Sequence, residues 1–483
     1  MKVEPRPETV SWRSSSRLAQ VVAELRRAAP AANVVDDPSE LYGYSYDASF
    51  ESLMNDYRPD VVVQPSGTAD VTAAVRIAAA HRIPVTTRGA ATGQAAGCVP
   101  VRGGIVMDMS RLNRIVELDA PNLQVIIEPG VVHANLNAFL APHGLIFPPD
   151  PGSSKMCTVG GMVANNSRGM RAVKYGSTGD YVLGLEVVLP SGEVVTTGSV
   201  GSRALQSSSG LELTKLFVGS EGLLGVICQL RLRVQPLPAR RGLVLASFDE
   251  LEATGRAVLA VFQAGILPAA GEILDRSAII AVNKYRPAMQ LSECEAMLLF
   301  EVDGSSVAVA HDVQRVADAV RPHASAVESA DDPARVAALW EARSLVGAAS
   351  GQVIPNAARV YAGEDICVPL ARVPEALRGI RSAGERHGLT IVTYGHIASG
   401  GLHAAPVINT SDQDAVRRVR IAADEIHQMA LRLNGTVTGE HGVGLTRVPY
   451  MRQEHGAALD LMRTIKRAID PHNLFNPGKV IPD

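Results

Sequence analysis

Two histidines in the last quarter of the chain, His396 and His403, lie seven residues apart with three glycines close by. A second glycine-rich segment places Glu440 directly before His441. On a straight strand an odd separation puts two side chains on opposite faces, but a glycine turn can bring both imidazoles to one point. Two imidazoles and a carboxylate are a reasonable ligand set for a divalent metal with open positions. The alternative is scattered histidines, some of them buried and hydrogen-bonded, because the chain contains 12.

A glycine-rich loop, Arg88-Gly89-Ala90-Ala91-Thr92-Gly93-Gln94, directly follows an expected strand at residues 84–87. Its successive amide groups carry no bulky side chains and suit a phosphate, although a plain turn would have the same composition. The GxGxxG, GxxxxGK[ST], GxSxG and HExxH motifs do not occur in the chain. A nicotinamide-type Rossmann enzyme and a P-loop NTPase are therefore not expected, and a different dinucleotide-binding architecture is favoured.

The elements that must position these residues change in character near residue 236. Before it, β-branched runs predict short strands at residues 61–63, 84–87, 104–109, 123–128, 185–189, 194–197 and 226–234. Helical periodicity predicts helices at residues 17–29 and 68–80, the second capped by Thr68. After it, helices at residues 250–264, 308–320 and 334–349 alternate with strands at residues 297–302 and 364–369. This alternation indicates an α+β or α/β second domain, followed by helices at residues 412–433 and 457–469.

The composition limits which classes of protein this chain can belong to. A chain of 483 residues predicts two or three domains, and 46% hydrophobic with 20% charged residues is typical of a globular protein. A net charge of −3 gives no reason to expect nucleic acid as a partner. The five cysteines form no CxxC pair, so we expect a reducing cytoplasm. The start lacks the apolar core of a signal peptide and no apolar run reaches 18 residues, so we expect no transmembrane segment, with peripheral docking at a membrane left open.

A series of motifs follows one another between residues 58 and 236. In order they are Arg88-Gly89-Ala90-Ala91-Thr92-Gly93, Pro148-Pro149-Asp150-Pro151, Thr158-Val159-Gly160-Gly161, Ala164-Asn165-Asn166, Lys174-Tyr175-Gly176, the strand expected at residues 180–190, and Gly219-Ser220-Glu221-Gly222 with the residues up to Ile227. On these motifs, residues 58–236 resemble the FAD-binding domain of the vanillyl-alcohol oxidase/p-cresol methylhydroxylase flavoprotein family. The resemblance implies an α+β fold: a two-subdomain FAD-binding domain, an α+β cap domain with an antiparallel sheet that binds substrate, and a C-terminal helical segment. We expect a lead-in at residues 1–57, the FAD domain at 58–236, the cap at 237–415, and a segment at 416–483 that packs back on the FAD domain.

The same resemblance implies which residues bind the cofactor, with residues 89–93 holding its pyrophosphate. The expected cofactor residues are Arg88, Gly89, Ala90, Ala91, Thr92, Gly93, Pro151, Gly152, Thr158, Gly160, Gly161, Asn165, Ser167, Arg168, Gly176, Glu221, Val226, Ile227 and Asn476. Some relatives attach FAD covalently through a histidine near the phosphate loop. The matching position here is Thr92, so we expect non-covalent FAD.

The C-terminal half resembles the FAD-linked 2-hydroxy-acid dehydrogenases that act on D-lactate, glycolate and D-2-hydroxyglutarate. Those relatives carry GHxGDGNxH, GEHGxG and a terminal NPGK, and this chain has His396, His403, Glu440, His441, Gly442, Gly444 and Asn476-Pro477-Gly478-Lys479. The resemblance implies that His396, His403 and Glu440 bind zinc or a similar ion. It implies that His441 is the base, and side chains that alternate along an extended segment would let Glu440 face the metal and His441 the substrate. A match to LWxxR makes Arg343 a candidate carboxylate clamp, against the alternative of a solvated salt-bridge partner.

Departures from the relatives' pattern narrow the expected substrate. Their Asp and Asn in the histidine loop are Ser399 and Gly401 here, a later Asn is Ala405, and a Thr one turn after the clamp is Gly347. Their pocket Lys has no counterpart near residues 363–365. Fewer polar anchors disfavour a dicarboxylate and favour a smaller or more apolar substrate.

These features predict an FAD-dependent enzyme that oxidises a 2-hydroxy acid of the D-lactate or glycolate type to a 2-oxo acid. The metal would hold the hydroxyl and carboxylate, His441 would take the proton and hydride would pass to the flavin. The electron acceptor is open among quinone, cytochrome, electron-transfer flavoprotein and oxygen, and a homodimer is an option because dimers are common among the relatives. The alternatives are a metal-independent FAD oxidase of an alcohol, sugar or phenol, and a non-catalytic flavin-binding redox subunit.

Overall fold

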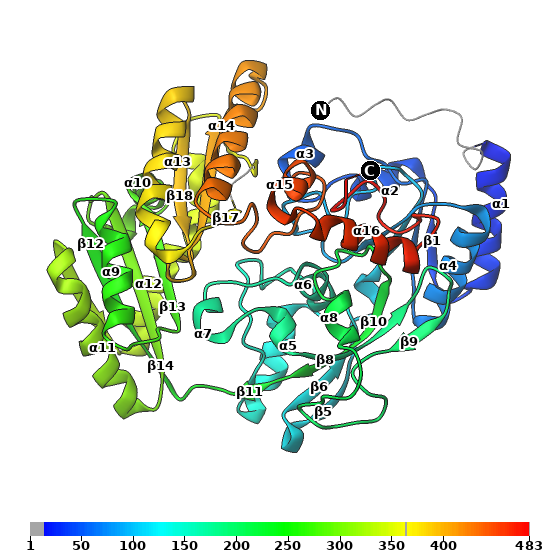
Figure 1. Cartoon of the computed structure of the whole chain (residues 1–483), viewed down its shortest axis with the longest axis horizontal. Coiled ribbons are helices and arrows are strands. Elements are labelled where there is room, and N and C mark those ends of the chain that lie inside the picture. The colour runs from blue at the N-terminus through cyan, green and yellow to red at the C-terminus, as the bar shows by residue number, and fades with distance from the viewer. Residues whose placement is uncertain (1–13, 363–364, 483) are drawn as a thin grey trace.

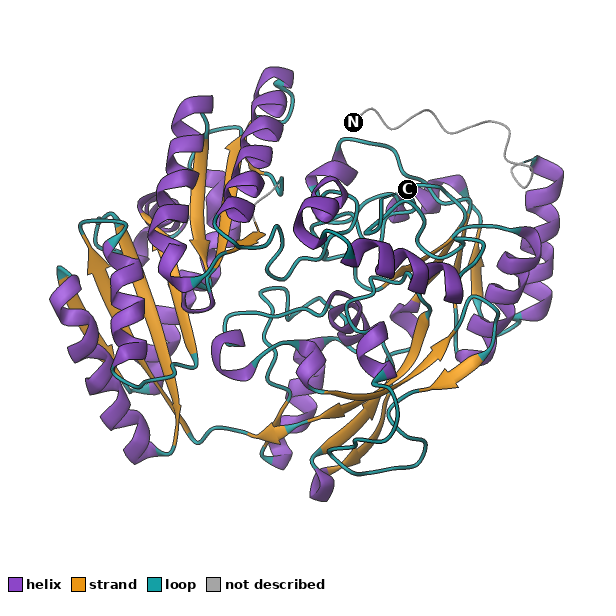
Figure 2. Ribbon diagram, viewed as in Figure 1, coloured by secondary structure: helices purple, strands orange, loops and turns teal. Residues whose placement is uncertain are grey.

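The computed structural model describes residues 14–362 and 365–482. Within them the chain forms three large β-sheets with helices packed around each (Figure 2). The first two sheets lie together in the blue-to-green half of Figure 1, and the third forms a separate body coloured green to orange. The expected α+β class is confirmed. Residues 1–13 of the predicted lead-in and residue 364 of the predicted strand at 364–369 lie outside the described residues.

The first sheet has the order β1-β2-β4-β3. Strands β2 (Val61–Gln64), β4 (Ile105–Asp108) and β3 (Val85–Arg88) are parallel, and β1 (Asn33–Val35) is antiparallel to β2. Helices α1 (Ser15–Ala28) and α4 (Thr68–His81) cover one face and α2 (Pro38–Leu41) packs on the other, so a continuous valine run can be buried on both sides. One detail of the prediction is wrong: Gly67, not Thr68, is the N-cap of α4. The Thr68 hydroxyl instead donates to Glu186 Oε1 at 2.6 Å.

The second sheet is antiparallel, in the order β5-β6-β10-β8-β9. Its strands are β5 (Ile115–Asp119), β6 (Gln124–Ile127), β10 (Val226–Arg233), β8 (Val182–Val188) and β9 (Val194–Thr196). Strand β10 alternates buried and half-buried residues, as expected for a sheet with one covered face. Residues 189–193 join β8 to β9 in a hairpin. A two-stranded pair, β7 (Leu145–Ile146) with β11 (Gln235–Pro236), leads out toward the third sheet.

Short helices connect the strands of this half. They are α3 (Phe50–Leu53), α5 (His133–Leu140), α6 (Val159–Asn165), α7 (Ala172–Tyr175) and α8 (Leu213–Phe217). Helix α6 begins at Thr158, whose hydroxyl accepts a hydrogen bond from Gly161 N, and it ends at Asn166 in a left-handed conformation. The start of α6 lies against the loop that follows β3. A Cβ added at Gly89 in that loop would lie only 2.3 Å from Thr158 Oγ1.

The third sheet is antiparallel, in the order β15-β12-β14-β13-β18-β19-β16, with β17 also paired to β19. Its strands are β12 (Arg240–Phe248), β13 (Ala270–Asp275), β14 (Ala296–Gly304), β15 (Ala326–Ala330), β16 (Ala358–Arg359), β17 (Asp365–Cys367), β18 (Thr390–Gly395) and β19 (Gly401–Ile408). Four helices share a hydrophobic core with one face of this sheet: α9 (Ala253–Gln263), α11 (Ser306–Val320), α13 (Val373–His387) and α14 (Gln413–Arg432). Helices α10 (Arg276–Tyr285) and α12 (Pro333–Ala349) pack on the opposite face. We call this body the cap.

The end of the chain returns to the first half, where α15 (Met451–His455) and α16 (Ala458–Ile469) lie over the second sheet in red (Figure 1). Phe475 forms a bridge with Val85 of the first sheet. By contrast, Ile426 and Ala430 of α14 belong to the hydrophobic core of the cap. The expected boundary at residue 416 falls inside α14, and we therefore propose that the cap extends over residues 237–433. No helix in the described ranges is long and apolar enough to span a membrane.

Candidate active site

A tight turn brings His396 and His403 together. His396 follows β18 and precedes the short 3₁₀ helix η10 (Ile397–Ser399), and His403 lies on β19, which runs back beside β18. The turn closes at Gly400, whose φ of 81° lies in the left-handed region that favours glycine. The two ring centroids are 5.2 Å apart. The glycine turn proposed from the sequence therefore does bring both imidazoles to one point.

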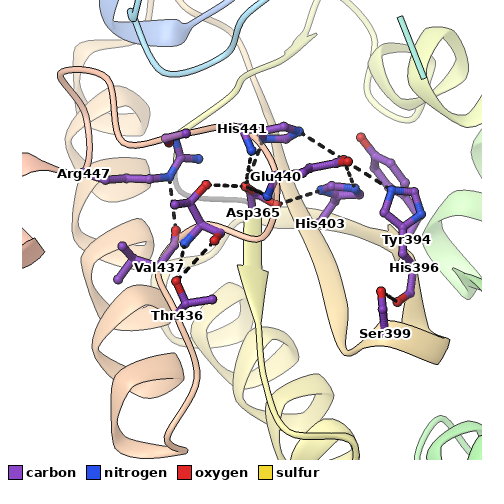
Figure 3. Close-up of polar contacts among 12 residues, drawn as sticks. Asp365, Tyr394, His396, Ser399, His403, Thr436, Val437, Glu440, His441 and Arg447 are labelled. Carbon is purple, nitrogen blue, oxygen red and sulfur yellow. Dashed lines mark hydrogen bonds and ion pairs between the residues drawn. The ribbon is translucent and has the colours of Figure 1, made fainter. Parts of the chain in front are cut away.

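A buried carboxylate, Asp365 on β17, holds the segment that carries Glu440 and His441. Its Oδ2 accepts hydrogen bonds from Glu440 N at 3.0 Å, His441 N at 2.8 Å and the Thr438 hydroxyl at 2.7 Å. From the N-terminal half, buried Glu221 accepts from the backbone amides of residues 443 and 444 at 2.7 and 2.8 Å. Residues 438–444, hereafter the 438–444 loop, are thus fixed by one carboxylate from each half of the molecule. Buried Arg447 further donates to the carbonyl of Val437 (Figure 3) and to that of Gly442.

Three imidazoles converge on one oxygen of Glu440, as Figure 3 shows. The Nε2 atoms of His396, His403 and His441 lie 3.3, 3.4 and 3.6 Å from Glu440 Oε1. The rings of His403 and His441 stack with an interplanar angle of 11°. The expectation that Glu440 and His441 point in opposite directions is wrong. Both peptide N–H groups donate to Asp365 Oδ2, which curls the backbone there and turns the two side chains toward the same point.

A second buried carboxylate supports the cluster from behind. Glu272, on β13 and fully buried, lies 2.8 Å from His396 Nδ1 through Oε1. Its Oε2 accepts a hydrogen bond from Arg343 Nε at 2.7 Å and forms an ion pair with Arg343 Nη2 at 2.7 Å. Arg343, on α12, lines the same cavity as the histidines, but its charge is already matched by Glu272.

Burial and mutual charge set the protonation of the cluster. Burial alone would lower the pKa of His396, but Glu272 and Glu440 outweigh it and raise that pKa to about 10. Burial lowers the pKa of His403 to about 3 and holds the pKa of His441 below its usual value. Burial would raise the pKa of Glu440, but His396 dominates and lowers it to about 2. At neutral pH His441 is therefore a neutral imidazole that can accept a proton.

One cavity of about 780 Å³ contains both this cluster and the glycine-rich loop after β3. In the loop, Ala91 has a φ of 55°, an uncommon conformation for a residue with a side chain. Asp47 Oδ2 and Gln94 Oε1, on residues that line the cavity beside the loop, are buried and have no hydrogen-bond partner. Unpartnered buried acceptor oxygens call for a hydrogen-bond donor, which a ligand with hydroxyl groups could supply.

The structure gathers most of the predicted site residues around this cavity. It is lined by Arg88, Gly89, Ala90, Ala91, Thr92, Gly93, Pro151, Gly152, Thr158, Gly160, Gly161, Asn165, Ser167, Glu221, Val226, Ile227, Arg343, His396, His403, Glu440 and His441.

Three predicted cofactor residues are not among those that line it: Arg168, Gly176 and Asn476. Arg168 is exposed. Asn476 is buried and donates to the carbonyls of Gly97 and Glu221, so it positions the wall from behind.

Sequence reasoning missed several residues of the site. Asp365 and Glu272 support the cluster, and Asp47, Tyr394 and Arg359 line the cavity. Glu272 does have a signal in the sequence, because it is a carboxylate in the middle of an otherwise apolar stretch, in a strand whose six residues are all buried. The partners of Asp365 lie more than 70 residues further along the chain, and no local pattern indicates them.

Comparisons with known proteins agree with this architecture. A family model described as FAD binding domain matches residues 59–198, and one described as FAD linked oxidases, C-terminal domain, matches residues 237–480. The chain is 34% identical over 441 residues to the glycolate oxidase subunit GlcD of Bacillus subtilis, covering 90% of this chain and 91% of the relative. It is also 34% identical over 435 residues to a probable mitochondrial D-lactate dehydrogenase of Danio rerio, covering 89% of this chain and 86% of that one.

Solved structures share the fold at much lower identity. p-Cresol methylhydroxylase superposes with a TM-score of 0.79 at 16% identity, covering 97% of this chain and 98% of that one. The 4-ethylphenol oxidase of Gulosibacter chungangensis gives a TM-score of 0.80 at 18% identity, covering 99% of both chains. The expected p-cresol methylhydroxylase-type fold is therefore confirmed. With both halves matched and the fold shared over nearly its full length, the chain belongs to the FAD-linked oxidase family.

Proposed function

We propose that this protein oxidises a 2-hydroxy acid of the D-lactate or glycolate type to the 2-oxo acid, with FAD as the electron acceptor and a divalent metal, zinc or a similar ion, as an aid. The observation that carries the proposal is the convergence of three imidazole Nε2 atoms on Glu440 Oε1 within the cavity that the glycine-rich loop lines. The glycolate and D-lactate names of the relatives support the same substrate class.

The cavity fits FAD in three respects. Residues 89–93 offer backbone amides with small side chains, as a pyrophosphate requires. The unpartnered oxygens of Asp47 and Gln94 suit hydroxyl groups such as those of a ribose or ribityl chain. Thr92 lines the cavity and cannot form the histidyl bond of covalent relatives, which supports dissociable FAD. When bound, FAD supplies a hydride acceptor that no side chain can provide.

The cluster also fits a divalent metal, held by His396, His403 and Glu440. Imidazoles that bind a metal usually direct their other ring nitrogen to a carboxylate or carbonyl oxygen, and His396 Nδ1 lies 2.8 Å from Glu272. His403 Nδ1 is buried without a hydrogen-bond partner, 4.0 Å from Asp365. Because a metal binds only neutral imidazole, it would displace the proton that His396 otherwise holds. A metal at this point supplies a Lewis acid that lowers the pKa of a substrate hydroxyl.

The remaining steps belong to the chain's own residues. His441, neutral because it is buried, takes the hydroxyl proton as general base. Asp365 holds the backbone of His441 and so fixes the position of its ring. Glu272 orients His396 through Nδ1 and keeps Arg343 in place. Residues of both the cap and the first half line the cavity in which the substrate would be oxidised.

The decisive experiment separates the base from the metal ligands. We expect His441→Ala to keep FAD and metal at wild-type stoichiometry and to lose flavin reduction by D-lactate or glycolate by roughly 10²- to 10⁴-fold. Chelation of the wild-type protein should also abolish reduction and leave FAD bound. Metal loss in His441→Ala would make this residue a ligand instead, and unchanged reduction would remove it from the mechanism. Activity that survives chelation, with no stoichiometric metal by elemental analysis, would favour a metal-independent oxidase.

A further inference from the structure

A short arm of the first half reaches the cap. Residues 171–175, hereafter the 171–175 arm, comprise Arg171 and helix α7, which lies against β13 and η10 of the cap (Figure 1). Val173 of the arm packs on the hydrophobic core of the cap. Strand β13 carries Glu272, and η10 directly follows His396. The arm therefore contacts both elements that hold the first histidine of the cluster.

The arm is fastened to carboxylates that the cap buries. Glu301 on β14 is fully buried, and its two carboxylate oxygens accept from Arg171 Nε at 2.7 Å and Nη2 at 2.8 Å. Two residues further along the same face of β14, the buried side chain of Asp303 accepts from the Tyr175 hydroxyl at 2.6 Å and pairs with Lys174. A bidentate pair between an arginine and a carboxylate fixes orientation as well as distance.

The counterion of Glu301 belongs to the other half of the molecule. Among the described residues, Arg171 is the only cation that donates a hydrogen bond to Glu301, because Arg241 of the cap lies 4.0 Å away and is about one-third exposed. The remaining donor, Trp340 Nε1 at 2.6 Å, is neutral. A cap that shifted away from the arm would leave a buried carboxylate without a paired cation, which is strongly unfavourable. The pair therefore holds the cap in one position.

The same arginine connects the two walls of the cavity. Arg171 Nη1 pairs with Asp150, which directly precedes residues 151–152 of the cavity wall in the first half. On the cap side, Trp340 lies on α12 one turn before Arg343, and the carboxylate that pairs with Arg343 also contacts the first histidine of the cluster. Direct contacts therefore run from the wall of the first half to the histidine cluster of the cap.

We infer that Arg171 is a positioning residue, which sets where the histidine cluster stands relative to the glycine-rich loop. Arg171 is not among the residues that line the cavity, so it acts through the arm. The inference rests on the proposed function for the reaction that is served, and on the buried contacts alone for the placement of the cap. A displacement of about 1 Å between reacting groups can slow a reaction roughly 100-fold. The expected signature is slow flavin reduction in a protein that binds FAD, metal and substrate normally.

The experiment separates position from stability in FAD-loaded protein. Arg171→Met leaves Glu301 buried without its cation, so the melting temperature should fall by roughly 5–15 °C. Combining it with Glu301→Gln removes the unpaired charge, while the new amide oxygen can still accept from Trp340. Most of the lost thermal stability should therefore return in the double variant. The limiting rate of flavin reduction by D-lactate or glycolate should stay about 10- to 100-fold low in both, with substrate affinity within about threefold of wild type.

A second readout needs no turnover. Backbone hydrogen exchange, followed by mass spectrometry, should be faster in residues 396–401 of both variants and unchanged in residues 89–93. Arg171→Lys keeps the charge and should recover part of the reduction rate. Arg381→Met is the matched control, because it breaks an arginine pair with Glu295 that lies wholly within the cap. It should leave both flavin reduction and exchange at residues 396–401 as in wild type.

The double variant decides between a positioning and a purely structural role. Recovery of the wild-type reduction rate together with the melting temperature would overturn the inference, and so would wild-type exchange at residues 396–401. A reduction rate that stays low while thermal stability returns would support it. If no hydroxy acid reduces the flavin of the wild-type protein, the proposed function fails, and the exchange measurement alone decides whether Arg171 places the cap.

Discussion

On one side of the cavity the chain presents mainly backbone, and on the other it presents side chains. The loop after β3 offers amides, glycines and one strained alanine, all within a short stretch of sequence. The histidine cluster draws His396, His403 and Glu440 from the β18–β19 turn and the 438–444 loop, and it depends on carboxylates from β13 and β17. The first kind of site is sensitive to added atoms, whereas the second is sensitive to a lost charge or hydrogen bond.

This difference suggests that the two sides can be damaged independently. A cofactor needs a surface of the right shape, and glycines can provide it because they have no side chain. Any substitution that adds a Cβ there is expected to obstruct the cofactor. Side chains that bind a metal or act as a base need defined protonation states, and buried carboxylates set these states. Replacing such a carboxylate by a neutral side chain is therefore expected to be harmful. Four predictions, taken from the largest expected effect to the smallest, would sharpen this contrast or remove it.

Glu440→Gln should have the largest effect. It replaces the carboxylate on which three imidazoles converge, so we expect loss of the metal and a fall of at least about 10³-fold in flavin reduction, since a lost Lewis acid raises the barrier by several kcal/mol. FAD affinity, measured by fluorescence titration, should stay within about twofold of wild type. A parallel loss of FAD would show that the two sides are not independent.

Gly89→Ala tests the opposite side. The new Cβ would lie 2.3 Å from Thr158 Oγ1, and Thr158 caps α6, so the loop must move. Overpacking of this kind costs about 1–3 kcal/mol, which corresponds to an FAD affinity roughly 5- to 150-fold weaker, with metal content unchanged. Gly67→Ala is the control, because a Cβ there meets nothing within 4 Å. Equal FAD affinities in the two variants would contradict a backbone-built cofactor site.

Asp365→Asn and Glu221→Gln each weaken one hold on the 438–444 loop. We expect each to cost about 1–3 kcal/mol in the free energy of unfolding, because buried amides lose a charged acceptor. Asp365→Asn should impair flavin reduction more than FAD binding, and Glu221→Gln should affect both, since Glu221 lines the cavity beside the glycine-rich loop. Denaturant unfolding of the double variant should show non-additive costs, and strict additivity would mean that the two carboxylates do not share the loop.

The smallest effect concerns pH. Burial, aided by Arg447, lowers the pKa of His427 on α14 to about 3, and neither ring nitrogen has a partner. Between pH 3 and 6.5 the unfolded chain binds one more proton at this residue than the folded chain. Its stabilising contribution is therefore complete above pH 6.5 and is lost as the pH falls. His427→Phe should flatten the decline of Tm between pH 7 and 5 by an amount equivalent to at most about 1.4 kcal/mol per pH unit. An unchanged slope would assign the decline to other groups.

The sequence allowed much of the fold to be predicted, for physical reasons that vary by element. The strands of the first half were predictable because β-branched runs such as Val61-Val62-Val63 lie between turn residues. Helix α13 has an equally clear helical periodicity, with Pro374 at its start and buried residues along one face. It was nevertheless not among the predicted helices. The proposed extension of the cap to residue 433 has no signal in the sequence, because the amphipathic pattern of α14 does not say which body its apolar stripe packs against.

The site was predictable where glycines and histidines are close together in sequence, and not where the support comes from afar. His396 and His403 share one turn, whereas Glu272 reaches His396 across 124 residues. The side-chain directions of Glu440 and His441 were predicted wrongly because hydrogen bonds to Asp365 replaced the extended backbone that the alternation rule assumes. Arg359 lines the cavity, but it belongs to no motif that the sequence analysis used.

The 438–444 loop has a consequence for recombination between relatives. An exchange of residues 237–433 transfers Asp365, His396, His403 and Arg359 from the donor but leaves Glu440 and His441 with the recipient. In every such chimera the cluster therefore combines residues from both parent proteins. Asp365 of the donor must then accept hydrogen bonds from the backbone of Glu440 and His441 of the recipient. Those contacts use main-chain amides, which every parent possesses. Substrate preference should thus be inherited with the cap, while the proposed base, His441, is inherited with the FAD-binding half.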